Sequence, residues 1–255
     1  MVCMFLVVAA FPALAEDAAP SAPAPAKKPV LLVVTVTKGY RHGSIETGER
    51  VTQEIADRSG AFTVDYARTD EDLKTKMSAS ALKNYQGIFF LSTTGTLPLP
   101  DKQAFLDYIK SGKGFIGCHS ATDTFHGEGD TVDPYIQMIG GEFVGHVEAS
   151  VSLINEDPTH PATHDIGSNW GVYDEIYGVK NFSRKDTHVL LSLDKVPGSD
   201  QPAYIPIAWT RDYGTGRVFY TALGHENLVW ESPKFQRHLL GGIKWAMRLE
   251  NPVKP

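Results

Sequence analysis

The chain has 255 residues, a formal net charge of −6 at pH 7 and no block of consecutive basic residues. This balance disfavours nucleic acid and anionic membrane surfaces as partners, because phosphate groups are bound by clustered lysine and arginine side chains. The two cysteines are Cys3 and Cys118, and Cys3 lies in a segment that we expect to be removed. Cys118 is then alone, so no intrachain disulfide is expected.

The N-terminus has the pattern of a secretory signal peptide followed by a linker. Residues 1–15 are mostly apolar and end in Ala13-Leu14-Ala15, which matches a signal-peptidase site with cleavage after Ala15. The run is shorter than the roughly 20 apolar residues of a membrane-spanning helix, so no membrane insertion is expected. Residues 16–29 are rich in alanine and proline and predict an extended linker. We therefore expect a periplasmic or secreted protein with a single domain over residues 30–251.

Strands and helices alternate over the first half of this domain. Buried strands are predicted at residues 29–36, 62–66, 87–91 and 114–118. Helices are predicted between them at residues 45–58, 70–80 and 100–110, and Ser44 is the expected N-cap of the first. This alternation predicts an α/β fold with a doubly wound, mostly parallel sheet.

The second half of the domain changes character. Short strands are predicted close together at residues 147–154, 170–179, 189–193 and 205–210. The turn residues between them indicate an antiparallel extension of the sheet. Residues 216–223 form another buried strand, and a helix over residues 233–249 closes the domain. The chain carries no coiled-coil pattern, and its sequence predicts no particular oligomeric state.

Three histidines follow predicted strands: His42, His119 and His225. Because the carboxyl ends of parallel strands meet at one edge of a sheet, we expect these side chains to converge in one pocket. Imidazoles serve as general acids and bases near neutral pH, and they also bind divalent metals. The sequence has no HExxH motif, so a metal site made by these three residues rests on their convergence alone. Metal-free acid–base chemistry stays open.

Several sequence blocks resemble the ThuA-like (trehalose utilisation) family. In chain order they are RHGSI (residues 41–45), GCHSATDT (117–124), GGEFVGH (140–146), HPAT (160–163), DEIY (174–177), GHE (224–226) and HLLGGI (238–243). They span nearly the whole mature chain. The family's fold resembles flavodoxin and the class I glutamine amidotransferases, which implies a doubly wound sheet. The resemblance also implies a small-molecule sugar as ligand, namely a trehalose-like disaccharide or a 3-keto sugar derivative.

The comparison with amidotransferases decides how Cys118 is interpreted. That superfamily carries its nucleophile in a Gly-x-Cys-x-Gly turn, and aligning Gly117 on the first glycine places His119 at the nucleophile position. Cys118 becomes the last residue of a strand, where a buried thiol has a raised pKa and is unreactive. His225 falls where the catalytic histidine of that superfamily lies. Glutamine amidotransferase activity is therefore expected to be lost.

Two groups of site residues are predicted. The catalytic group consists of His42, His119, His225 and Glu175. Because adjacent strand residues face opposite sides, only one of Asp174 and Glu175 is expected to point into the pocket, and the family pattern favours Glu175. The substrate-binding group consists of Tyr40, Asp123, His146, Tyr177 and Trp230. Among these, the aromatic rings of Tyr40 and Trp230 are candidate platforms for a sugar ring, with ordinary packing as the alternative.

The remaining histidines have simpler interpretations. His126 lies in a glycine-rich segment and is expected to be solvated, whereas His160 sits in a proline turn and is expected to be structural. The other three, His164, His188 and His238, are interpreted as surface or packing residues.

The expected function is carbohydrate processing by histidine-based acid–base chemistry. One imidazole removes a proton next to a sugar carbonyl, and His42 or a divalent metal stabilises the resulting enediolate. Isomerisation, epimerisation and elimination of the glycosidic bond are all compatible with this step. Two alternatives stay open: a carbohydrate-binding protein without turnover, and a metal-dependent hydrolase of glycosides or esters.

Overall fold

The computed structural model describes residues 1–3, 27–129 and 131–249. Most of the expected signal peptide, with its cleavage after Ala15, and most of the expected linker fall on residues 4–26, outside the described part. Within that part, no helix combines the length and the apolar character needed to cross a membrane.

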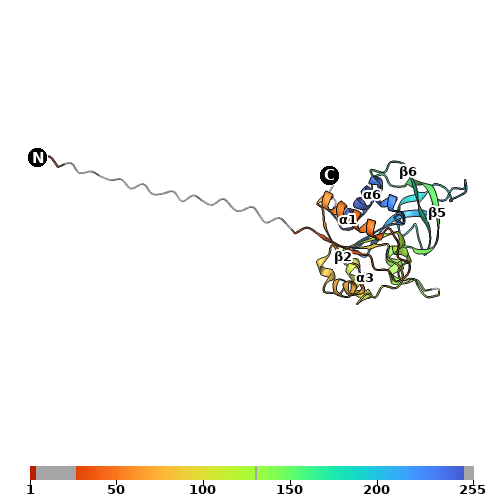
Figure 1. The fold of residues 1–255 in the computed structure, drawn as a ribbon, viewed down its shortest axis with the longest axis horizontal. Coiled ribbons are helices and arrows are strands. Elements are labelled where there is room, and N and C mark those ends of the chain that lie inside the picture. The colour runs from red at the N-terminus through yellow and green to blue at the C-terminus, as the bar shows by residue number, and fades with distance from the viewer. Residues whose placement is uncertain (4–26, 130, 250–255) are drawn as a thin grey trace.

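A mixed sheet of nine strands forms the centre of the described domain (Figure 1), in the order β2-β1-β3-β4-β9-β8-β7-β5-β6. The parallel strands are β1 (Val30–Val34), β2 (Thr63–Ala67), β3 (Gly87–Leu91), β4 (Gly114–Cys118) and β9 (Gly216–Thr221). The antiparallel strands are β5 (Glu142–Asn155), β6 (Asn169–Lys180), β7 (His188–Leu193) and β8 (Pro206–Tyr213). The fold is therefore α/β, with a parallel part continued by an antiparallel part.

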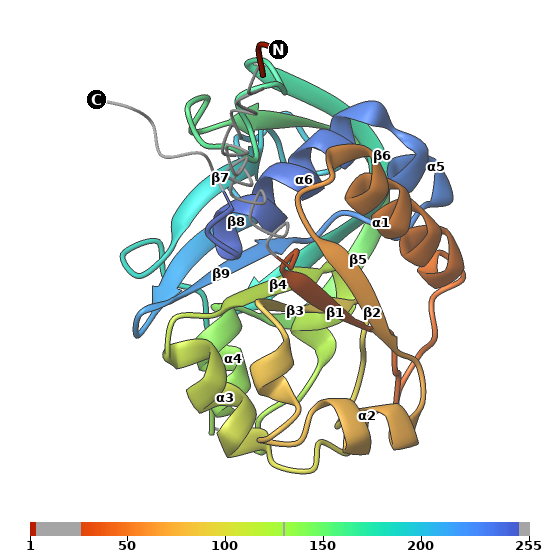
Figure 2. The ribbon, with the colours of Figure 1, turned by 90° about the vertical axis from the view of Figure 1, so that its left-hand side faces the viewer.

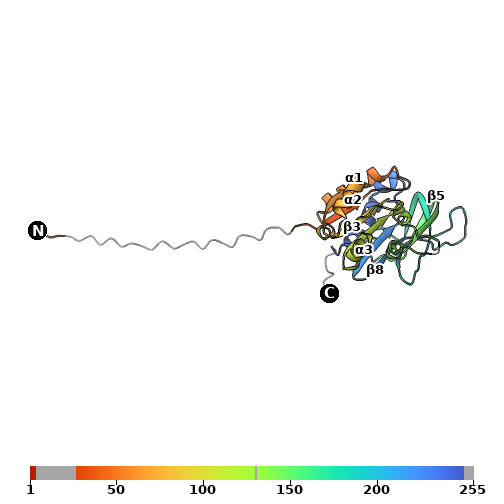
Figure 3. The same ribbon diagram turned by 90° about the horizontal axis from the view of Figure 1, so that it is seen from below.

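Helices cover both faces of the parallel part (Figure 2). One face carries α1 (Ile45–Ser59), α5 (Asn227–Glu231) and α6 (Pro233–Ala246), and the other carries α2 (Asp70–Lys76), α3 (Lys102–Lys110) and α4 (Pro134–Ile139). Figure 3 shows the molecule from below, that is, from the side of the sheet that carries α2 and α3. This arrangement explains why every residue of β3 and β4 is buried and why both strands are almost entirely apolar.

Aromatic side chains fill the two layers between sheet and helices. Phe90 of β3 stacks on Phe105 of α3 and on Tyr135 of α4, with ring centroids 5.5 and 5.6 Å apart. On the other face, Phe219 of β9 packs against His238 of α6 at 5.2 Å. The rigid core of the parallel part thus fixes the ends of β1, β4 and β9, from which the candidate site is built.

Some local expectations are corrected. Ser44 precedes α1 but does not cap it; its hydroxyl instead donates to the Gly224 carbonyl at 2.9 Å. The helix expected over residues 70–80 ends at Lys76, and the Ser78 hydroxyl donates locally to the Thr75 carbonyl, as serines in turns do. The strand expected at residues 147–154 is the second half of the longer β5, which places His146 on a strand.

Candidate active site

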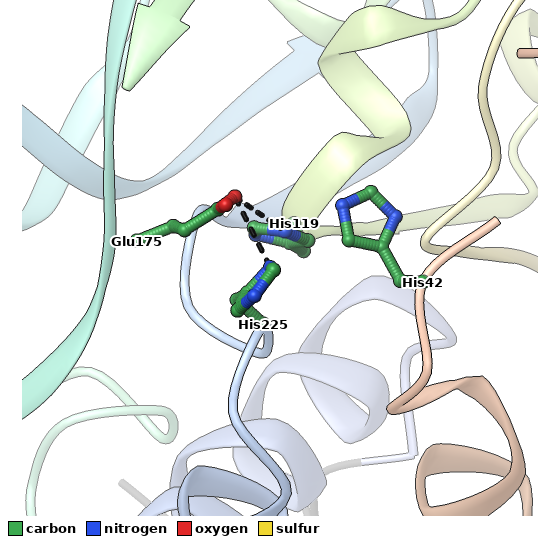
Figure 4. A group of neighbouring side chains, drawn as sticks. All are labelled: His42, His119, Glu175 and His225. Carbon is green, nitrogen blue, oxygen red and sulfur yellow. Dashed lines mark ion pairs between the residues drawn. The ribbon is translucent and has the colours of Figure 1, made fainter. Parts of the chain in front are cut away.

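Three loops at the carboxyl edge of the parallel strands bring His42, His119 and His225 together. His42 follows β1, His119 follows β4 and His225 follows β9, and Glu175 of β6 completes the group. One nitrogen or oxygen atom of each residue lies within 4.8 Å of the others (Figure 4). Strand β6 lies at the far edge of the sheet, but its residues contact α5, while those of β5 contact the 3₁₀ turn His119–Asp123. The β5–β6 hairpin therefore bends over the carboxyl edge and delivers Glu175.

His119 is held in one orientation. Its φ of +52° lies in the left-handed region, which a residue with a side chain adopts only when its surroundings enforce it, and which is frequent at functional sites. The fully buried ring places Nδ1 3.0 Å from the Ala222 carbonyl oxygen. Since a carbonyl only accepts, Nδ1 carries the proton and Nε2 keeps its lone pair. The Tyr177 hydroxyl donates to this Nε2 at 3.0 Å.

Glu175 is surrounded by three imidazoles. Its Oε2 lies 3.4 Å from His119 Nε2 and 3.1 Å from His225 Nδ1. Its Oε1 lies 3.3 Å from His146 Nδ1. Burial raises the pKa of Glu175, but its interactions with the side chains of His119, His225 and His146 outweigh this effect, so the pKa lies below its usual value. The carboxylate is therefore ionised at neutral pH.

His42 is a neutral imidazole at neutral pH. The ring is buried, meets the rings of His119 and His225 edge-on at 4.6 and 5.4 Å, and places Nδ1 3.3 Å from the Ser120 hydroxyl. Burial, followed by repulsion from the neighbouring histidines, lowers the pKa of His42 to about 3. Such a ring offers a lone pair or a neutral N–H group, but not a positive charge.

Asp174 has a supporting role that its sequence context does not reveal. Its fully buried carboxylate accepts hydrogen bonds from the backbone N–H of Gly224 at 2.7 Å and from that of Glu226 at 3.0 Å. Burial raises the pKa of Asp174, and these two N–H groups partly offset the effect. As expected for adjacent strand residues, only Glu175 points to the histidines. Asp174 instead fixes the loop that carries His225.

Trp230 is a packing residue, which is the alternative to the sugar platform that the sequence left open. Its side chain is completely buried, packs on Phe235 at 5.0 Å, and donates its indole N–H to the Gly224 carbonyl at 2.9 Å. Trp230 and Ser44 therefore hold the carbonyl end of Gly224, while Asp174 holds its N–H end.

Cys118 occupies the place expected for a structural thiol. It is fully buried, and its Sγ donates to the Leu223 carbonyl at 3.1 Å. Burial raises the pKa of this thiol well above its usual value, so no thiolate forms at neutral pH. The neighbouring Gly224 has a φ of +121°, and a Cβ there would lie 2.9 Å from this sulfur. The close contact with Cys118 and the positive φ therefore require glycine at position 224, next to His225.

The exposed rim of the site contains two of the predicted substrate-binding residues. Tyr40 is 67% exposed, and its ring meets that of His42 edge-on at 4.8 Å. The His146 side chain is 42% exposed and lies beside Glu175. Tyr177, in contrast, is buried and contacts His119. A ligand that reaches the cluster from solvent would therefore meet Tyr40 and His146.

Asp123 lies outside the histidine cluster and forms one of two ion pairs that share His126. Its Oδ1 lies 2.5 Å from His126 Nε2, while His126 Nδ1 lies 2.8 Å from Glu142 Oε1. Partial burial lowers the pKa of His126, but the bonds to Asp123 and Glu142 outweigh it, so the pKa lies above its usual value. His126 is thus an ordered tie between the loop and β5, rather than a freely solvated residue.

The other histidines lie outside the cluster. His160 and His238 are buried and bond to the backbone at Ala162, whereas the side chains of His164 and His188 are exposed. These positions agree with the structural, surface and packing roles expected for them.

Comparisons with known proteins identify a family and several similar structures. The chain matches the model of the family ThuA, trehalose utilisation, over residues 30–246. A ThuA-like protein of Parabacteroides merdae is similar in structure, with a TM-score of 0.69, 19% identity, and coverage of 90% of this chain and 93% of that one. A ThuA-like protein of Bacteroides uniformis has a TM-score of 0.67 and 22% identity, with coverage of 90% of this chain and 95% of that one.

A more distant likeness concerns the fold alone. A β-galactosidase of Bacillus circulans aligns with 84% of this chain but 30% of its own, at 8% identity and a TM-score of 0.53. No match was found among curated proteins. Because the family match extends over almost the entire described domain, the chain belongs to the ThuA (trehalose utilisation) family.

Proposed function

We propose that this protein is a carbohydrate-active enzyme that abstracts a proton next to the carbonyl of a keto sugar, assisted by a divalent metal. The observation that carries the proposal is the convergence of His42, His119, His225 and Glu175 within 4.8 Å. The class of ligand is supported by the family's description, trehalose utilisation.

The donor set fits a divalent transition metal. Three imidazoles and one carboxylate are the ligand types that zinc, manganese and iron accept in enzymes. His119 donates its Nδ1–H to a backbone carbonyl, which is how metal-binding histidines are commonly oriented. The nearly buried, ionised Glu175 supplies a negative charge to this set of donors. A cation held among these atoms would polarise a carbonyl oxygen of the substrate.

His146 is the base that the geometry favours. Glu175 uses its two oxygens differently: Oε2 faces His119 and His225, whereas Oε1 faces His146 Nδ1. In the tautomer whose Nδ1–H points towards this carboxylate, the ring of His146 has its lone pair on Nε2. That nitrogen can accept a proton, in the way a carboxylate orients a histidine base in many hydrolases. The exposed ring of His146 makes it accessible to substrate.

The substrate chemistry is that of a sugar with a ketone at C3. The hydrogens on C2 and C4 are acidic because removal of either gives an enediolate or enolate. Return of the proton to the same or the neighbouring carbon gives epimerisation or isomerisation. After removal of the C2 proton, the bond from C1 to the glycosidic oxygen breaks, and this oxygen leaves as a hydroxyl by taking up the proton held by His146. All three outcomes start with proton transfer to His146, from C2 for the elimination and from C2 or C4 for the other two.

Two further proposals concern the whole chain. Helices on both faces and the strand order β2-β1-β3-β4-β9 support a doubly wound, flavodoxin-like description of the parallel part. The apolar residues 1–15 with Ala13-Leu14-Ala15 support export to the periplasm or beyond.

The test is proton exchange in D₂O, followed by NMR, with 3-keto-trehalose as the probe. We expect metal-loaded protein to exchange or eliminate at C2 or C4, and chelation to stop it. His146→Gln should slow the reaction by about 100-fold or more while it retains metal, whereas His164→Gln, an exposed histidine outside the cluster, should react normally. Sugar binding without exchange would favour a binding protein. Hydrolysis without deuterium in the sugar would favour a metal-dependent hydrolase.

A further inference from the structure

A second cavity, of about 410 Å³, lies near the opposite edge of the sheet from the histidine cluster. It is lined by the start of β7, the second half of β8 and the end of α6, whose Ala246 lies against Gly114 at the start of β4. The histidine cluster, in contrast, follows the ends of β4 and β9. The volume lies in the range of small-molecule sites.

An aromatic ring forms one wall of this cavity. Trp245 is partly exposed, and the Arg217 guanidinium packs over its ring at 4.8 Å. The His160 ring lies 5.3 Å from it. These neighbours hold the indole in a fixed position. A fixed aromatic surface is suited to the apolar C–H face of a sugar ring.

Two buried N–H donors at this cavity have no partner among the described residues. His160 is only 8% exposed, and its Nδ1 accepts the backbone N–H of Ala162 at 3.1 Å. The ring proton is therefore on Nε2, which is buried and unpaired, as is Nε of Arg211. Burial lowers the pKa of His160 to about 4, so the ring remains a neutral donor. An unpaired buried donor costs about 1–3 kcal/mol, so these two atoms leave unmet hydrogen-bonding capacity behind the wall of the cavity.

The charges on the cavity wall balance. Lys185 and Arg211 are cationic, and Asp186 and Asp212 are anionic. A lining with equal numbers of cationic and anionic side chains gives an anion such as phosphate little net electrostatic attraction. A polyhydroxylated molecule, in contrast, can form hydrogen bonds with both kinds of side chain. Its hydroxyl oxygens accept from the N–H donors, and its hydroxyl protons go to the carboxylates. We infer that this cavity is a second carbohydrate-binding site, which takes a neutral mono- or disaccharide and acts independently of the histidine cluster.

The chain provides a separate reporter for each site. It has four tryptophans, so an ¹⁵N-labelled protein gives four indole N–H signals. Trp245 lines the second cavity, and Trp230 donates its indole N–H to Gly224 beside His225. Loss of one signal in Trp245→Phe and of another in Trp230→Phe assigns the two. Titration with trehalose, glucose and maltose, and with inorganic phosphate for comparison, then follows both sites in one spectrum.

We expect at least one of these sugars to shift the Trp245 signal saturably, and phosphate to leave it in place. Asp212→Ala should weaken that binding about tenfold, the loss of one charge-assisted hydrogen bond, whereas Asp165→Ala, at an exposed carboxylate elsewhere, should not. His225→Ala should leave the Trp245 titration unchanged. The inference is overturned if no sugar shifts Trp245, if phosphate alone does, or if His225→Ala abolishes the shift. None of these outcomes bears on turnover at the histidine cluster.

Discussion

Replacement of Asp174 by asparagine tests whether the Asp174 carboxylate positions the loop that carries His225. Asp174 binds two backbone N–H groups through different oxygens, Gly224 at 2.7 Å and Glu226 at 3.0 Å. Asparagine has one acceptor oxygen and one amino group, so one of the two N–H groups would face a donor. An unsatisfied buried N–H costs about 1–3 kcal/mol. Relief of the buried charge offsets part of this, and we expect a net loss of about 1–2 kcal/mol.

For a domain of this size, each kcal/mol lowers Tm by about 2–4 °C, so calorimetry should show Asp174→Asn melting about 2–8 °C below wild type. Metal titration should show a 10- to 100-fold weaker affinity, as for other residues that orient metal ligands. Asp165→Asn, the same change at an exposed carboxylate, should alter neither quantity. If Asp174→Asn binds metal as tightly as wild type, Asp174 does not position His225 and the reasoning is refuted.

Three further predictions concern single side chains. The raised pKa of His126 means that its ion bridges stabilise the fold fully below its ordinary pKa of 6.5 and lose this contribution as the pH rises through the raised value. Urea unfolding against pH should therefore show a loss above neutrality in wild type that His126→Ala lacks, and equal profiles would contradict it. The pH dependence that His238 contributes to stability is opposite to that of His126. Burial lowers the pKa of His238 to about 4, so the free energy of unfolding falls by up to about 3 kcal/mol as the pH drops from 6.5 towards 4. His238→Phe should be less acid-sensitive, and an unchanged slope would count against the buried neutral ring. Cys118 should resist iodoacetamide in the folded protein and react after unfolding, and Cys118→Ala should retain turnover; rapid labelling of folded protein would revive a thiolate mechanism.

Those parts of the fold that depend on local pattern could be predicted from the sequence. The nearly continuous apolar runs of β1, β3 and β4 mark strands that are covered on both faces, and the helices between them imply parallel order. Parallel order in turn brings the ends of β1, β4 and β9 to one edge. The convergence of His42, His119 and His225 follows from that topology alone.

Features that depend on distant packing could not be predicted. Trp230 follows the His225 loop, and the burial of its ring is decided by the packing of α5 against α6. Strand alternation places the side chains of Asp174 and Glu175 on opposite faces of the sheet. It does not reveal that a loop 50 residues later supplies two N–H groups to Asp174. The glycine-rich surroundings of His126 indicate solvent, whereas Glu142 at the start of β5 holds the ring in place.

The central claim is that His42, His119, His225 and Glu175 hold a divalent metal, and metal content measures it most directly. Wild type, His119→Ala and the control His164→Ala would be dialysed against zinc, manganese or iron(II), freed of unbound metal, and analysed by mass spectrometry, with folding checked by circular dichroism. The account predicts about one metal per chain in wild type and control, and none in a folded His119→Ala protein. Absence of metal from wild type, or equal retention by folded His119→Ala, would contradict it.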